Sequence, residues 1–78
     1  MSPFTRKALR SLEAARPASG FRPETEPEWR KLQAANILVS EAMYRCLGAS
    51  KSEAKRLAHL TMGGPAGRIF LEIVFGHE

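Results

Sequence analysis

The chain has 78 residues, enough for one domain at most, and its core must be thin. The chain contains 12 Lys and Arg, 8 Glu and no Asp, which gives a formal charge of +4 at pH 7. This charge indicates an anionic partner, either nucleic acid or an acidic protein surface, unless it serves only solubility. Cys46 is the single cysteine, so no internal disulfide is possible and a reducing compartment is expected. No apolar run reaches the length of a membrane span, and we expect a cytoplasmic protein.

A first helix is predicted to begin after Ser2, an N-cap hydroxyl that precedes Pro3, and to end near Ala15. One of its faces is apolar, with Phe4, Ala8 and Leu12 at every fourth position. Off that face lie three cations that would meet water or a ligand: Arg6, Lys7 and Arg10. Residues 16–27 contain three prolines and a glycine and are predicted to be a connecting loop, which Phe21 pins to the core.

The central helix has the clearest signals of the sequence. Thr25 and Glu28 form a capping box at its start, and Gly48 after Leu47 suits a left-handed helix end. Between them, residues repeat at alternating spacings of three and four, as in a coiled-coil seam. The seam consists of Trp29, Leu32, Asn36, Val39 and Met43. This seam predicts either a homodimer, in which the Asn sets the register, or coverage of the seam by the chain's own helices. Cys46 continues the seam and is expected to be a small core residue.

A third helix is predicted to open at Ser50, with Glu53 completing a second capping box, and to stop at two glycines. Its inward residues are expected to be Ala54, Leu57, Ala58 and Thr61. Residues 66–75 fit a helix or a strand, and a helix is favoured because a lone strand has nothing to pair with. The expected fold is therefore all-α: one domain, 1–78, with three to four helices around a long central helix, unless residues 68–75 form a strand.

Residues 43–57, MYRCLGASKSEAKRL, resemble a helix-turn-helix DNA-binding motif. Leu47 and Gly48 match the end of its first helix, and Ala49 and Ser50 match its turn. The resemblance implies that the following helix enters the major groove of DNA and presents its polar face there. That face would carry Lys51, Ser52, Lys55, Arg56 and His59. The cations of the first helix, Arg6, Lys7 and Arg10, would add contacts to the DNA backbone.

Patterns for catalysis or metal binding are missing from the sequence. The glutamates at the start of the central helix are explained by the helix dipole, which favours negative charge there. Cys46, His59 and His77 match no zinc spacing. We expect a non-catalytic binding protein with no cofactor and no metal, in first place a helix-turn-helix-like DNA-binding regulator. The alternative is a protein-binding inhibitor or adaptor that covers an acidic or nucleic-acid-binding surface of a larger partner. In size and charge, this chain resembles the small modulators encoded by phages and other mobile elements.

Overall fold

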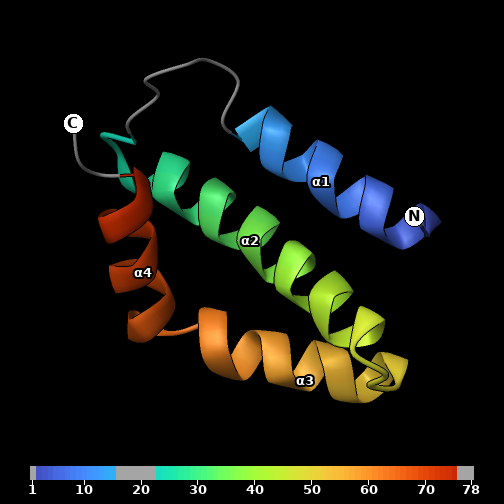
Figure 1. The fold of residues 1–78 in the computed structure, drawn as a ribbon. Helices are drawn as coiled ribbons and strands as arrows, with labels where there is room; N and C mark the ends of the chain where they lie inside the picture. Colours follow the sequence, from blue (N-terminus) through green and yellow to red (C-terminus); the bar gives the residue numbers. More distant parts are fainter. Residues whose placement is uncertain (1, 16–22, 76–78) are drawn as a thin grey trace.

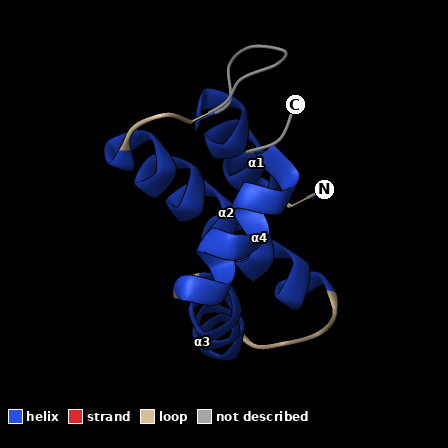
Figure 2. Ribbon diagram, turned by 90° about the vertical axis from the view of Figure 1, so that its left-hand side faces the viewer, coloured by secondary structure: helices blue, strands red, loops and turns tan. Residues whose placement is uncertain are grey.

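The computed structural model describes residues 2–15 and 23–75, and helices are the only regular secondary structure of those residues (Figures 1 and 2). They are α1 (Pro3–Ala15), α2 (Glu26–Cys46), α3 (Lys51–Met62) and α4 (Pro65–Phe75). The predicted all-α bundle around a long central helix is confirmed, and residues 68–75 are helical. The predicted loop 16–27 is too long by two residues, because the cap at Thr25 starts α2 at Glu26. Phe21 and His77 lie outside the described residues.

The long helix α2 is the middle of the molecule. Figure 1 shows α1 and α3 on opposite sides of α2, each running in the opposite direction to it. The last helix, α4, leads from the end of α3 back to the beginning of α2 and contacts both. The other three helices therefore pack around α2, with α1 and α3 on its opposite sides and α4 near its beginning.

Side-chain and backbone caps set the helix bounds. The hydroxyls of Ser2, Thr25 and Ser50 each accept a hydrogen bond from the backbone N–H three residues later. At the end of α2, the N–H of Gly48 donates to the carbonyl of Arg45, and the next N–H donates to the carbonyl of Tyr44. This pair of bonds is a Schellman motif, and it places Gly48 at φ 101°, a backbone conformation that glycine adopts without strain.

The main core lies where α1, α2 and α4 meet at the beginning of α2, a region that we call the closed end. It is built from Ala15, Trp29, Leu32, Ala35 and Leu71, with Leu12 packed against it. The side chains of Leu32 and Leu71 are completely buried. Large side chains thus hold α1 and α4 against α2 at this end, and hydrophobic burial here supplies much of the fold's stability.

The corner between α3 and α4 completes the closed end. The side-chain amide of Gln33 on α2 donates to the carbonyls of Met62 (2.9 Å) and Gly64 (3.3 Å), which satisfies the carboxyl end of α3. Gly67 is buried in the first turn of α4, and a Cβ there would overlap the backbone of Met62. The backbones of α3 and α4 therefore approach so closely that only glycine fits.

Arg68 connects α4 to the beginning of α2. Its guanidinium lies 4.6 Å from the centre of the Trp29 ring, a cation–π distance. It also pairs with Glu26 of α2 at 2.9 Å and with Glu72 of its own helix at 3.2 Å. The hydrogen bond and charge of Arg68 hold the pKa of Glu26 below its ordinary value. Arg68 therefore has a structural role in this fold.

The second half of α2 is packed by small side chains, and we call this region the open end. Ala8 of α1, Ala42 of α2, and Ala54 and Ala58 of α3 are all buried there. Two expectations for inward residues are wrong: Cys46 is exposed, and Thr61 is exposed with its hydroxyl donating to a carbonyl of its own helix. Cys46 is the last residue of α2, and Thr61 lies in the last turn of α3.

Candidate binding groove

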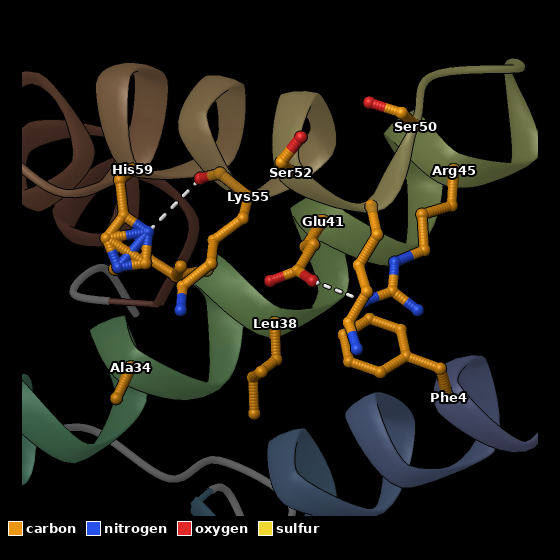
Figure 3. A pocket seen from close by; sticks show the side chains of 11 residues that line it. Phe4, Ala34, Leu38, Glu41, Arg45, Ser50, Ser52, Lys55 and His59 are labelled. Atoms are coloured by element: carbon orange, nitrogen blue, oxygen red, sulfur yellow. Dashed lines mark hydrogen bonds and ion pairs between the residues drawn. The ribbon is translucent and has the colours of Figure 1, made fainter.

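The open end contains a groove of about 870 Å³ between α1 and α3, which we call the α1–α3 groove (Figure 3). Its floor is the exposed face of α2, which contributes Ala34, Ile37, Leu38, Glu41 and Arg45. One wall is α3 with the turn before it, which contributes Ser50, Lys51, Ser52, Lys55 and His59. Phe4 of α1 forms the other side. Figure 3 shows Leu38 and Glu41 lying between the α3 side chains and Phe4.

The floor of the groove is apolar apart from one internal ion pair. Glu41 is buried, and its carboxylate accepts a hydrogen bond from Arg45 at 2.7 Å. The guanidinium of Arg45 in turn stacks 3.8 Å from the centre of the Phe4 ring. Glu41 therefore has its own cation, and the three side chains tie the amino-terminal turn of α1 to the floor.

The α3 wall of the groove carries two lysines. Lys51 and Lys55 belong to this wall together with His59, and all three side chains are exposed. The ring Nδ1 of His59 lies 3.3 Å from the carbonyl of Lys55, which orients the imidazole along the helix. On α1, Lys7 follows Phe4 by one helical turn and therefore lies on the same side of that helix. The apolar floor thus lies between two lysines of α3 and one side of α1 that carries a lysine near the groove.

The whole net charge of the chain comes from these two wall helices. α1 contains three cations and one glutamate, and α3 contains three cations and one glutamate. In α2 and in α4, cations and acids are equal in number, and the residues outside the helices also balance. Positive potential is therefore concentrated on both sides of the groove, where it would attract an anionic ligand.

The structure divides the predicted recognition face of α3. Lys51, Ser52, Lys55 and His59 line the groove, but Arg56 does not. Arg56 forms an exposed ion pair with Glu53, whose carboxylate has a lowered pKa because the guanidinium donates to it and carries a positive charge. Of the predicted α1 cations, Arg6, Lys7 and Arg10 are all exposed. Four of the five polar residues thus line one wall of the groove, and Arg56 lies outside it.

The predicted seam of α2 is divided as well. Trp29 and Leu32 belong to the chain's own core, so they are not accessible to a second copy while the fold is intact. Asn36 is half-buried, and its side-chain nitrogen is buried without a hydrogen-bond partner among the described residues. Val39 and Met43 line a smaller apolar groove of about 310 Å³ between α1 and α2. A continuous dimer seam through all five residues is therefore not available, because α1 and α4 occupy its first half.

Sequence reasoning missed the floor of the α1–α3 groove. Ile37 lies outside the predicted seam, and Phe4 was assigned to the inward face of α1. One signal was present: Glu41 and Arg45 are spaced for an ion pair within an otherwise apolar stretch of α2. Such a pair indicates that part of the helix remains near solvent.

The described residues contain neither a metal-binding cluster nor a membrane-spanning helix. No three His, Cys, Asp or Glu side chains in that part of the chain lie close enough together to hold a metal ion. No helix there combines the length and the apolar character that crossing a membrane requires.

Comparison with known proteins adds no relative. No protein-family model, no characterised protein and no solved structure matches this chain. The groove and its charge are therefore the basis on which a function can be argued.

Proposed function

We propose that this chain is a non-catalytic protein-binding module whose α1–α3 groove holds an acidic amphipathic helix of a larger partner. The observation that carries the proposal is an apolar floor beside a wall that carries Lys51 and Lys55. A helix that docks in a groove buries an apolar stripe with residues at i, i+3, i+4 and i+7. Ala34, Ile37, Leu38 and Glu41 of the floor repeat at the same spacings, so two helices could interdigitate there.

Charge would select such a partner. Acidic residues beside its apolar stripe would meet Lys51, Lys55 and Lys7, and these contacts exclude partners with basic flanks. Glu41 does not oppose them, because its carboxylate is already paired with Arg45. The proposed activity is that of an inhibitor or adaptor, which acts by occupying a helix of another protein.

The first test uses two designed peptides of roughly 16 residues, long enough for about four helical turns. Both carry the same leucine stripe, but one is flanked by glutamates and the other by lysines. Fluorescence anisotropy should show binding of the glutamate peptide at least about tenfold tighter than binding of the lysine peptide. Equal affinities, or no binding of either peptide, would refute the proposal.

A pair of variants then locates the site. Lys55→Ala removes a cation of the groove wall, while Arg56→Ala removes the next residue's cation, which lies outside the groove. We expect Lys55→Ala to lower the affinity for the glutamate peptide by about threefold to tenfold. Arg56→Ala should change this affinity by less than about twofold. Ala34→Gln, at an exposed position of the floor, should obstruct the groove without affecting the core. Circular dichroism confirms that each variant is folded.

A second function, DNA binding, is favoured by the amino-terminal turns of α3. Lys51, Ser52, Lys55 and Arg56 are all exposed there, which is where a recognition helix contacts base edges and phosphates. The same two variants separate the functions, because a duplex contacted by α3 should lose affinity with Arg56→Ala as well as with Lys55→Ala. The affinity for a mixed-sequence duplex, measured at about 50 and 200 mM salt, should then be much higher at the lower salt concentration. Binding of peptide but not of duplex supports the groove.

A further inference from the structure

The outer side of α4 is apolar and has no covering element among the described residues. Ile69, Phe70, Ile73 and Val74 are all largely exposed, with Ile69 at 57% and Ile73 at 63%. They follow the spacing i, i+1, i+4 and i+5, so they form one continuous face, which we call the α4 face. Leu71 and Gly67 of the same helix are buried, and Leu71 belongs to the core of the closed end.

The α4 face is unusual for a lone domain, because contiguous exposed apolar residues generally mark an interaction surface. Isolated apolar side chains on a surface are ordinary, but here four large ones share two turns of one helix. The chain also does not need this face for its own core, because α4 is already attached by Leu71 and by the Arg68–Glu26 ion pair. Among the described residues, no element therefore remains to cover the α4 face.

Charge identifies which partner this face suits. A protein with a formal charge of +4 repels its own copies wherever cations would meet. The cations that cause this repulsion lie on α1 and α3, while the single cation of α4, Arg68, is neutralised by Glu26 and Glu72. Two copies that meet through α4 would bring together the neutral, apolar surfaces of both. The basic walls would stay at the outside of the pair.

We infer that two copies of this chain associate through the α4 face, with the two α4 helices antiparallel about a two-fold axis. Such an interface is isologous, so each apolar residue packs on the apolar face of the other copy. Four half-exposed side chains supply on the order of 400 Å² of apolar area per copy, which falls in the size class of weak complexes. The dimer is therefore concentration-dependent, with a dissociation constant of about 10 to 500 µM.

This inference is independent of the proposed function, because the α4 face and the α1–α3 groove share no residue. Each copy in the dimer would keep its groove open. A failed peptide-binding experiment would leave the dimer intact, and a monomeric protein would still be able to bind the peptide.

Sedimentation velocity of the full chain from about 5 to 500 µM tests the inference. The wild-type mass should rise from monomer towards dimer across this range. Ile73→Glu should remain monomeric at every concentration, because it places a charge in the apolar face of both copies. Leu47→Glu is the matched control: Leu47 is 80% exposed at the open end, and its variant should dimerise like the wild type. Circular dichroism shows whether both variants keep their helices.

A mixing experiment keeps the inference falsifiable even if one variant folds poorly. In an antiparallel pair centred on the α4 face, the two Ile73 positions lie within about one helical turn of each other. Ile73→Glu and Ile73→Lys should each be monomeric alone and should dimerise when mixed, because opposite charges then meet. A wild-type mass that stays monomeric up to the highest concentration overturns the inference. So does a dimer that survives Ile73→Glu and is lost in Leu47→Glu.

Discussion

The two ends of α2 are packed in different ways, although they belong to one continuous helix. At the closed end, Trp29 and Leu32 are buried between helices that contribute Leu71 and other apolar side chains. At the open end, the buried apolar side chains are alanines, and large side chains such as Met43 and Leu47 remain exposed. Alanines let helices approach without filling the space beside them, and the two grooves described above lie there. One end of the helix therefore stabilises the fold, and the other end leaves apolar surface in contact with solvent.

The largest expected effect comes from removing a side chain of the closed end. Leu32→Ala would leave a cavity at a completely buried position and should lower the free energy of unfolding by about 2–5 kcal/mol. Leu47→Ala at the open end should change it by less than about 0.5 kcal/mol, since that side chain is already in water. Urea denaturation followed by circular dichroism measures both. Equal losses for the two variants would remove the distinction between the ends.

A smaller loss of folding stability is expected from a substitution at the corner between α3 and α4. Gly67→Ala places a Cβ against the carbonyl of Met62, so the backbone must shift, at a cost of about 1–3 kcal/mol. Gly64→Ala is the control in the same turn, because a Cβ there meets nothing within 4 Å. Thermal denaturation of the two variants compares them directly. If Gly67→Ala were as stable as Gly64→Ala, the close approach of α4 to α3 would not be required for the closed end.

The smallest effect concerns pH and the ion pair that anchors α4. Arg68 lowers the pKa of Glu26 in the folded chain below the ordinary value of 4.5, so the pair stabilises the fold above that pH. The stabilisation is lost as the pH falls from 4.5 through the lowered pKa, because the folded chain must then protonate Glu26. Melting temperatures measured across this range should fall less steeply for Glu26→Gln and for Arg68→Gln than for the wild type. Identical slopes in all three proteins would show that the pair contributes nothing.

Local signals predicted the helices well, because capping is encoded within a few residues. Ser2, Thr25 and Ser50 each cap a helix as expected, and Gly48 ends α2 in the left-handed conformation. These interactions depend on neighbours in the chain and on nothing distant. The bounds of α1, α2 and α3 follow from them, and so does the all-α fold.

The sequence did not predict which faces the helices would cover. Periodicity marks an apolar face but not its neighbour, so Cys46 was assigned to a core that stops short of it. The same limit applies to α4, where Ile69, Phe70, Ile73 and Val74 are exposed while Leu71 is fully buried. The α1–α3 groove depends on how α1, α2 and α3 pack against one another, which brings together residues that are distant in the sequence. No local pattern contains that information.

The placement of charge on the outer helices has a kinetic consequence. An acidic helix approaching this molecule would be attracted to the groove between α1 and α3. A larger share of its encounters would then occur at the binding surface. Association could then exceed the roughly 10⁵–10⁶ M⁻¹s⁻¹ of uncharged partners and would slow as salt screens the walls. Dissociation would depend on the apolar floor, which salt affects little. Capture and retention of a partner would therefore be controlled by different residues: the lysines of the walls, and Ile37 and Leu38 of α2.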